Sequence, residues 1–465
     1  MTALTWAALA ATLLGFIGIG LYARAPSAGV DDYVTARNSQ GALALGLSFL
    51  ASGMGGWILF APPEVGVGLG WIAVAGYAAG SALPFVVFAL FGARLRRLMP
   101  QGRSIAEFMR LRFGAGMERW VLTLSVLYML CFVTAELTAA GAIVNMLTDV
   151  DGRVVIVGVA LATLVYTAWG GLRASMLTDR WQAWLLLALL AIVSFAVTPL
   201  LQRPGLSWQL PSAPAANPWA VALTLLIAVT ASNLFHQGYW QRMWSARSGQ
   251  ALRAGAAVGA AATLLMVLLV GGFGVLAAAA GLDVGSPPLP FFALLHALPA
   301  WLVLPAVLLG VTLVASSVDT LENALASLAV AQRPTLSLAS ARWLTVLLMI
   351  PAILVALQGY SVLRLFLIAD LLCATAVVPL LMGLSPRTTR AAALASAGAG
   401  VAGAFLPTWL STGSLAAALH AASFPGAVPT LAPFAGALAA SAVVGAVITA
   451  LSREPRGPDL ARAAD

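Results

Sequence analysis

A run of polar residues interrupts a long apolar stretch of this chain, residues 308–330. The oxygen-bearing side chains are those of Ser316, Ser317, Asp319, Thr320 and Asn323. At about 100° per residue, Ser316, Thr320 and Asn323 share one face of a helix, and Asp319 lies beside them. Oxygen atoms are the ligands that hard cations prefer, and polar side chains inside a membrane are costly unless they serve a function. The stripe therefore predicts an ion or substrate site.

The composition places this stripe in a membrane protein. Of the 465 residues, 61% are hydrophobic and 9% are charged, and the mean hydropathy is +0.96. Apolar windows of about 20 residues, the length that spans a bilayer, recur about thirteen times between residues 3 and 451. The first window is expected to be a retained helix rather than a secretory signal, because no arginine precedes it. We predict an all-α polytopic membrane protein with about thirteen transmembrane helices.

The arginines predict the orientation of the chain. All 24 basic residues are Arg, and if the N-terminus is outside, only Arg153, Arg203 and Arg364 fall in outer loops. The positive-inside rule then places the N-terminus outside and the C-terminus in the cytoplasm. We expect a multi-pass protein of the cell inner (cytoplasmic) membrane. Since topology accounts for the arginine excess, no nucleic-acid partner is expected.

Two spans carry helix-breaking or polar sequence halfway across the membrane. The second span has three glycines in four positions, and the seventh has a polar and aromatic segment, residues 230–242. Non-helical backbone at that depth is tolerated only where it faces protein or a wet cavity. The breaks are five helices apart, as in transporters built from two repeats of opposite topology that each contain a broken helix at the substrate site. For the glycines alone, close helix packing is an equally good explanation.

Other residues have two interpretations that the sequence leaves open. Glu136 in the fourth span corresponds by spacing to Asp319 and is either a proton relay or the partner of a polar or backbone group. The cytoplasmic loop around Ser104 and Glu107 has capping-box spacing, with Gly114 able to end the helix. That helix either links two moving bundles or only sets topology.

The segment from Tyr166 to Gln182 resembles the signature of the sodium/solute symporter family, which includes sodium-galactose and sodium-proline carriers. The aromatic, Thr, Gly-Gly, Ala, Thr-Asp and Gln residues all fall at the family's spacing. Further similar positions are Asp31-Asp32-Tyr33, Arg112-Phe113-Gly114 and Ala315-Ser316-Ser317. The resemblance reaches to about residue 385. It implies a LeuT-like fold with a 5+5 inverted repeat core, one extra N-terminal helix and two extra C-terminal helices.

That resemblance implies the following organisation of the chain. The expected parts are 1–42 for the N-terminal helix and cytoplasmic linker, 43–200 and 217–384 for the two five-helix repeats, 390–452 for two C-terminal helices, and 453–465 for a cytoplasmic tail.

The same resemblance implies a principal sodium site between the second and ninth spans. The matching ligands are the backbone carbonyls of Ala51, Met54 and Leu313 and the hydroxyls of Ser316 and Ser317. An unwound backbone beside two hydroxyls independently suits a hard cation. A second cation site known in some members corresponds to Ser316, Asp179, Asp319 and Thr320. Because Asp319 stands where those members carry a hydroxyl, this site either binds a cation more strongly or holds a proton.

The expected substrate contacts lie at the two breaks. They are Gly53, Gly55, Gly56, Trp57, Glu136, His236, Gln237 and Tyr239. Gly53 and Gly55 stand where sodium-proline carriers have an Asp and a Ser, and His236 stands where galactose carriers have a substrate-binding Asn. Proline and sugar are therefore disfavoured. The likeness of Met54 to Trp57 favours an amino acid or a related compound.

The predicted function is sodium-coupled symport of a small polar organic solute into the cell by alternating access. Sodium is the coupling ion, the bilayer surrounds the protein, and we expect a monomer or weak homo-oligomer. One alternative is a proton-coupled carrier of the same fold, with Asp319, Glu136 or His236 titrating. Another is a solute-sensing module with a separate signalling partner, since the tail after the last span is only about 13 residues. No enzyme is expected, because the sequence offers neither a catalytic triad nor a metal cluster, and Cys131 and Cys373 lie in apolar windows.

Overall fold

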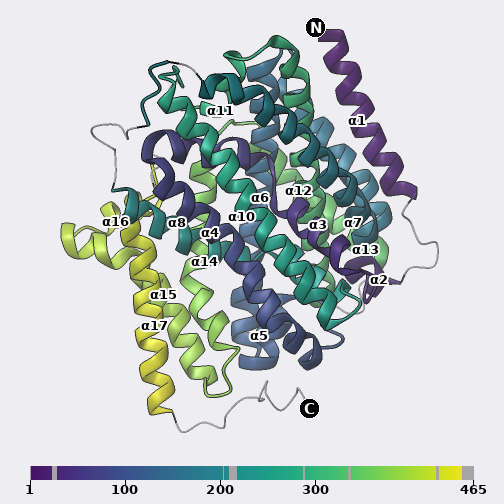
Figure 1. The fold of residues 1–465 in the computed structure, drawn as a ribbon. Helices are drawn as coiled ribbons and strands as arrows, with labels where there is room; N and C mark the ends of the chain where they lie inside the picture. The colour runs from purple at the N-terminus through teal and green to yellow at the C-terminus, as the bar shows by residue number, and fades with distance from the viewer. Residues whose placement is uncertain are drawn as a thin grey trace.

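The computed structural model describes residues 2–22, 29–202, 204–208, 217–285, 288–332, 337–425 and 429–452. Arg203 and the predicted tail 453–465 lie outside these residues. The described part is a bundle of helices without a named strand (Figure 1). The helices are α1 (Thr2–Tyr22), α2 (Val30–Thr35), α3 (Ala42–Gly53), η1 (Gly56–Leu59), α4 (Ala61–Leu98), α5 (Ile105–Phe113), α6 (Ala115–Leu147), α7 (Gly152–Leu201), α8 (Pro218–Leu234), α9 (Gln237–Ser245), α10 (Gly249–Ala279), α11 (Pro290–His296), η2 (Ala300–Leu302), α12 (Val303–Gln332), α13 (Leu338–Ala356), α14 (Val362–Met382), α15 (Arg390–Thr412), α16 (Leu415–Ala422) and α17 (Leu431–Leu451).

The number of membrane crossings follows from these helices and two glycines. In the described residues ten helices are long and apolar enough to cross a membrane, and eleven if the bent pair α8 and α9 forms one span. Two of the long helices are themselves pairs: α4 turns at Gly70 (φ 69°) and α7 at Gly171 (φ 59°), a backbone conformation that glycine adopts most readily. Dividing α4 and α7 there, with α3 joined to the first half of α4, gives thirteen candidate spans in the described residues, the number expected from the sequence.

Both predicted breaks are present. In the second span, α3 ends at Gly53, the backbone is extended at Met54 and Gly55, and η1 begins at Gly56. In the seventh span, α8 ends at Leu234 and α9 begins at Gln237 after a bend of 56°. The ends of α3 and α8 release backbone carbonyls that would otherwise be bonded within a helix.

Helices of the two predicted repeats pack against each other. The main contacts join α4 to α10, α3 to α10, α4 to α8, and α12 to α6 and α7. α15 and α17 form a pair beside α14, and α1 lies along the opposite flank next to α7 (Figure 1). α1 begins at the top of Figure 1 and α17 ends at the bottom, as an odd number of crossings requires. The exact repeat boundaries stay a prediction.

At the bottom of Figure 1, α5 is the helix predicted from capping-box spacing. The Ser104 hydroxyl accepts a hydrogen bond from Glu107 N, and the Glu107 carboxylate accepts one from Ser104 N. Gly114, at φ 80°, ends the helix.

An ion-pair cluster joins α2 to the loop before α5. The Asp31 carboxylate accepts hydrogen bonds from Arg37 Nη2 at 2.9 Å and Arg103 Nε at 3.0 Å. Partial burial opposes its ionisation, but the two guanidinium groups outweigh burial and hold the pKa of Asp31 below its usual value. The neighbouring Asp32 pairs with Arg173 of α7 at 2.6 Å. These pairs fasten the predicted cytoplasmic ends of several helices to one another.

Candidate functional site

A narrow gap lies where the broken end of α3 faces α7 and α12. We call it the ion gap, and it is lined by Ala51, Met54, Gln182, Leu186, Thr312, Leu313 and Ser316. Four of the five predicted principal ligands are thus brought together here. The fifth, Ser317, is buried next to Ser316 on α12 without being part of the lining, and its hydroxyl has no hydrogen-bond partner among the described residues.

The chemistry of the ion gap suits a cation. The gap lies at the C-terminus of α3, where the helix dipole places partial negative charge. The Ala51 carbonyl accepts only a long bond of 3.3 Å from Met54 N. No ionised side chain lines the gap, so a cation there would be held by oxygen dipoles alone.

Two polar residues of the ion gap were missed by the sequence analysis. The side-chain amide of Gln182 and the hydroxyl of Thr312 are buried and lack hydrogen-bond partners among the described residues. Unpartnered buried polar atoms are rare, and both side chains offer oxygen to a cation. Gln182 ends the signature segment, and Thr312 lies one helical turn before Ser316. These two positions are the signals in the sequence from which both ligands could have been predicted.

Beside the ion gap lies a buried guanidinium that the sequence analysis left unassigned. Arg242 of α9 is fully buried, and its Nη2 donates to Asp179 Oδ2 at 2.6 Å and to Thr320 Oγ1 at 3.0 Å. Its Nε donates to Ser48 Oγ at 2.8 Å. Ser316 Oγ donates to the other Asp179 oxygen at 3.1 Å. We call these residues the arginine cluster; in it, a side-chain cation lies between Asp179 and Thr320, where the second cation site was predicted.

Asp319 is bonded mainly to hydroxyls of α7, with one long bond of 3.4 Å from Thr320 of the arginine cluster. Its carboxylate accepts hydrogen bonds from Tyr166 Oη at 2.6 Å, Ser175 Oγ at 2.6 Å and Thr178 Oγ1 at 3.1 Å, all on α7. One turn further on, Glu322 accepts a bond from Thr163 Oγ1 at 2.9 Å. The hydroxyls satisfy Asp319 without a cation, and whether it binds an ion or a proton stays a prediction.

Glu136 reaches the break in the second span. Its Oε2 accepts a hydrogen bond of 2.6 Å from Gly56 N, and its Oε1 is buried without a partner among the described residues. A Cβ on Gly55 would lie 2.1 Å from Glu136 Oε1. The carboxylate therefore requires glycine at Gly55, and the backbone partner that the sequence left open is the Gly56 amide.

Aromatic rings connect the two breaks. Trp57 stacks on Tyr77 with centroids 5.5 Å apart and meets the edge of Phe366 at 6.3 Å. Phe366 meets Phe132 at 4.9 Å, Phe132 meets His236 at 5.6 Å, and His236 stacks on Tyr239 at 4.2 Å. We call these six residues the aromatic cluster. Both ring nitrogens of His236 are buried without partners in the described chain.

Gln237 does not face this cluster. Its Nε2 donates to Arg103 O at 2.6 Å and Ser327 Oγ at 3.0 Å, and its Oε1 accepts from Ile105 N at 3.1 Å. All its polar atoms are engaged, so it links α9 to the loop before α5. This differs from the expected substrate contact.

A third group of acids surrounds Tyr77 of the aromatic cluster. The Tyr77 hydroxyl interacts electrostatically with Glu64, Glu136 and Asp370. Asp370 of α14 lies beside Ser232 of α8. The ion pairs in the described part of the chain involve none of these three acids. We call Glu64, Glu136 and Asp370 the central acids.

A cleft of about 860 Å³ leads toward the central acids, and we call it the outer cleft because it lies at the predicted outer ends of the helices. Glu64 and Phe60 line it from the end of the broken span, Thr138 from α6 and Leu363 from α14. α6 also carries Glu136, and Asp370 lies two turns beyond Leu363 on the same face of α14. The cleft thus opens between the elements that carry the central acids.

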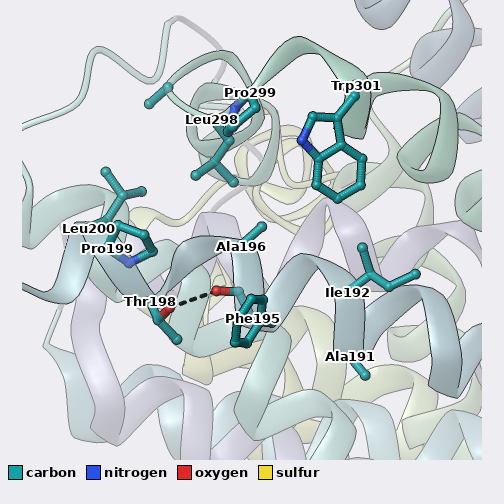
Figure 2. Close-up of a pocket in the computed structure, with 11 residues that line it drawn as sticks. Ala191, Ile192, Phe195, Ala196, Thr198, Pro199, Leu200, Leu298, Pro299 and Trp301 are labelled. Atoms are coloured by element: carbon teal, nitrogen blue, oxygen red, sulfur yellow. Dashed lines mark hydrogen bonds between the residues drawn. The ribbon is translucent and has the colours of Figure 1, made fainter.

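A second cleft, of about 750 Å³, differs in character (Figure 2). It lies between the end of α7 and the segment before η2, and its side chains are apolar except that of Thr198, which donates to Phe195 O. Phe195 is 80% and Trp301 61% exposed. Such a surface suits lipid chains rather than a polar solute.

Comparison with sequence families agrees with this geometry. A profile of the Sodium:solute symporter family matches residues 33–218. The family resemblance predicted from the signature segment is confirmed.

Three curated relatives are transporters. The chain is 28% identical over 373 residues to the spermidine transporter DUR31 of Candida albicans, covering 76% of this chain and 70% of the relative. It is 27% identical over 121 residues to the urea-proton symporter DUR3 of Oryza sativa subsp. japonica, covering 26% of this chain and 17% of that one. It is 23% identical over 137 residues to a urea active transporter of Saccharomyces cerevisiae, covering 29% and 19%. The two urea carriers are therefore matched over only a small part of their length.

Solved structures share the fold. A sodium-coupled sialic acid symporter, in a substrate-bound outward-open state, superposes with a TM-score of 0.74 at 17% identity, covering 98% of this chain and 99% of that one. MHP1, a transporter of the nucleobase-cation-symport-1 family, gives 0.57 at 14% identity and covers 95% and 99%. The predicted all-α, LeuT-like fold is confirmed, and the proteins that this chain resembles are membrane transporters rather than enzymes.

Proposed function

We propose that this transporter couples the entry of sodium to the uptake of a small polar organic solute by alternating access. The ion gap carries the proposal. Backbone oxygens at the end of α3 and hydroxyls of α12 converge there. The unpartnered oxygens of Gln182 and Thr312 offer two further ligands to a cation. The family profile and the sodium-coupled structural neighbour support the same coupling ion.

Sodium in the ion gap would connect helices of both repeats. α3 belongs to the predicted first repeat and α12 to the second, so an ion between them favours one relative position of the two. The end of α3 is also the break that Glu136 and the aromatic cluster contact. Ion binding would therefore order the substrate region, and movement of the repeats would then expose ion and solute to the cytoplasm.

The energy supplied by one sodium ion is sufficient for accumulation. One charge crossing ~100 mV gives about 2.3 kcal/mol, and a tenfold sodium gradient adds about 1.4 kcal/mol. Together they support roughly 500-fold accumulation of a neutral solute.

A proton-coupled carrier of the same fold is the second candidate. The rice relative is named a urea-proton symporter. Asp319, a buried carboxyl that accepts bonds from three hydroxyls of α7, is a group that could gain and lose a proton. In the sodium proposal, Asp319 keeps its hydroxyl partners throughout the cycle. In the proton proposal it gains and loses a proton, with Glu136 or His236 as further titrating groups. A solute sensor with a separate signalling partner stays the third prediction.

Location and solute belong to the same proposal. We place the protein in the cell inner membrane with its N-terminus outside and its C-terminus in the cytoplasm, as a monomer or weak homo-oligomer. The likeness of Met54 to Trp57 favours an amino acid, whereas the relatives are named for spermidine and urea. These solutes differ in charge, so the charge of the substrate region is the property that separates them.

The test is uptake and sodium binding in purified, reconstituted protein. Melting is measured in sodium, lithium and potassium at several pH values for the wild type and for Ser316→Ala, Gln182→Leu and the control Ser396→Ala. Ser396 is a buried serine of α15 bonded to Ser441, far along the chain from the ion gap. We expect sodium-specific stabilisation, and at least about tenfold weaker sodium binding in the first two variants, because one interaction with a charged group contributes about 1.5–3 kcal/mol.

Two results would refute sodium coupling. One is equal melting in sodium and potassium at saturating salt for all four proteins. The other is uptake that ignores sodium but collapses when the pH gradient is removed, which would select the proton-coupled carrier.

A further inference from the structure

We propose that the solute is an organic cation with two or more ammonium groups, a linear diamine or polyamine, held between Glu136 and Asp370 against the aromatic cluster. The inference rests on the proposed symport function and specifies its substrate. It is argued from the charges, the unpartnered atoms and the rings around the break in α3.

The first argument is an imbalance of charge. Glu136 accepts a bond from Gly56 N next to Trp57, and Asp370 lies one helical turn after Phe366 on α14. In the described part of the chain no arginine pairs with either acid or with Glu64. Buried carboxylates without a cation are costly. A solute that brings ammonium groups would remove that cost on binding.

The second argument is the set of unpartnered polar atoms. Glu136 Oε1 and both nitrogens of His236 are fully buried and lack partners among the described residues. Glu136 lies against the broken backbone at Gly55, and His236 lies between Tyr239 and Phe132. An ammonium group carries three donors and no acceptor, and it can donate to the free oxygen of Glu136 and to the one unprotonated nitrogen of a neutral His236.

The third argument is that Glu136 already occupies a backbone amide that an anionic group could use. In transporters with broken helices, free backbone amides at the break bind substrate carboxylates. Here the Gly56 amide already donates to Glu136 Oε2. Arg242 interacts with His236, but Asp179, Thr320 and Ser48 engage it. An amino acid would bring its carboxylate toward Glu136 with no cation to oppose it, so the geometry favours an amine over the expected amino acid.

The aromatic cluster suits the rest of such a molecule. Aromatic faces attract ammonium groups within about 6 Å of the ring centroid, and Trp57, Tyr77, Phe132 and Phe366 supply faces and edges next to the central acids. The same rings would cover the methylene chain between the charged ends. Two acids on different helices, Glu136 on α6 and Asp370 on α14, match two ammonium groups on one chain.

The outer cleft provides an approach of suitable charge. Glu64 lines it and is one of the central acids, whereas the one arginine among its lining residues, Arg153, is exposed. A cleft of about 860 Å³ is within the ordinary range for small-molecule sites, about 300–1,000 Å³. A cation entering it would pass Glu64 before reaching Asp370 and Glu136.

The test is equilibrium binding of radiolabelled 1,4-diaminobutane to the purified full-length protein in saturating sodium. The competitors are spermidine, butylamine, 1,4-butanediol, ornithine and urea. Butylamine removes one ammonium group, butanediol removes both charges, and ornithine adds a carboxylate to the same diamine. We expect spermidine to compete and each of the other four to be at least about tenfold weaker than unlabelled 1,4-diaminobutane, in line with the loss of one charged interaction.

The variants Glu136→Gln and Asp370→Asn should each weaken diamine binding at least about tenfold. The matched control is Glu118→Gln on α6, whose carboxylate is already bonded to Gln332 and paired with Arg110; its diamine affinity should be unchanged. Sodium-dependent stabilisation of Glu136→Gln and Asp370→Asn shows that both are folded. Absent diamine binding, tighter binding of ornithine or urea, or unaltered affinity in both variants would overturn the proposal.

The same experiment separates this inference from the symport proposal. Sodium stabilisation without diamine binding would refute only the solute class. Diamine binding that ignores sodium and the Ser316→Ala substitution would refute sodium coupling and leave the solute class standing. Transport currents add an independent measure: a diamine with one sodium moves three positive charges per solute, whereas a neutral solute with one sodium moves one.

Discussion

Two groups of buried acids lie in this protein and differ in how their oxygens are satisfied. In the arginine cluster, both oxygens of Asp179 accept hydrogen bonds, and Arg242 supplies a positive charge. Among the central acids, Glu136 has one bonded and one free oxygen and no cation. Both groups lie next to broken spans, so depth in the membrane does not explain the difference.

The comparison separates a permanent cation from an exchangeable one. A guanidinium on α9 is part of the chain and bonds to side chains of α3, α7 and α12. In the described part of the chain the central acids have no such partner, and a ligand that leaves after each cycle would match them. The acids that a solute can use are therefore those that the protein leaves incompletely bonded.

The strongest test of this comparison removes the permanent cation. Arg242→Met leaves Asp179 buried without its charged partner, and breaking a buried pair in this way costs about 3–5 kcal/mol. We expect a large fall in melting temperature in detergent, partly restored in the double variant Arg242→Met with Asp179→Asn. Arg253→Met, at an exposed arginine of α10, is the control. A stability of Arg242→Met equal to that of the control would mean that the two groups of acids do not differ as proposed.

The next test alters the contact between Glu136 and the break. In Gly55→Ala the new Cβ would lie 2.1 Å from Glu136 Oε1, so the carboxylate or the backbone must shift. Overpacking of this kind costs about 1–3 kcal/mol, and the shift should weaken diamine binding as well. Gly68→Ala, where an added Cβ meets nothing within 4 Å, is the matched control. Wild-type binding in Gly55→Ala would show that the position of Glu136 is unimportant.

Local sequence signals were sufficient for the scaffold. Apolar windows, the glycines at 53–56 and the polar segment around His236 are each contiguous in sequence, and they predicted the spans and both breaks. The capping box of α5 depends on two residues three positions apart and was equally accessible. Among the residues of the ion gap, Ser316 came from the polar stripe, whereas Ala51, Met54 and Leu313 came from the family resemblance. Gln182 and Thr312 were missed.

Partners distant in sequence were not accessible in the same way. Arg242 and Asp179 are 63 residues apart, and Gly56 and Glu136 are 80 apart. Which buried acid receives a charged partner depends on how helices pack, and no periodicity encodes it. Gln237 shows the same limit: it adjoins His236 in sequence, but its amide bonds to the loop before α5.

A smaller effect on stability is expected when a central acid is neutralised. Glu136→Gln keeps an oxygen that can accept from Gly56 N and removes a buried charge without leaving an opposite charge unpaired. We expect its unfolding free energy to change by less than about 1 kcal/mol, the usual size of one neutral hydrogen bond, although diamine binding is weakened. Glu136→Ala, which loses the acceptor for the Gly56 amide, should be clearly less stable. A loss in Glu136→Gln as large as that in Arg242→Met would remove the distinction between the two groups.

The smallest effect is expected at Asp31, an acid whose partners are permanent like those of Asp179 but which lies outside the membrane-spanning helices. Pairs this exposed contribute about 0–1 kcal/mol, so Asp31→Asn should lower stability only slightly at pH 7. Because Arg37 and Arg103 hold the pKa of Asp31 below its unfolded value of about 3.9, this contribution is present above that pH and is lost as pH falls through the folded pKa. The difference in melting temperature between wild type and Asp31→Asn should therefore vanish in acid and shrink in high salt.

A difference that instead grows as the pH falls would show that burial, and not the two arginines, dominates at Asp31. Charge pairing would then dominate only at the Arg242–Asp179 pair, which lies inside the membrane, where no water competes for the carboxylate.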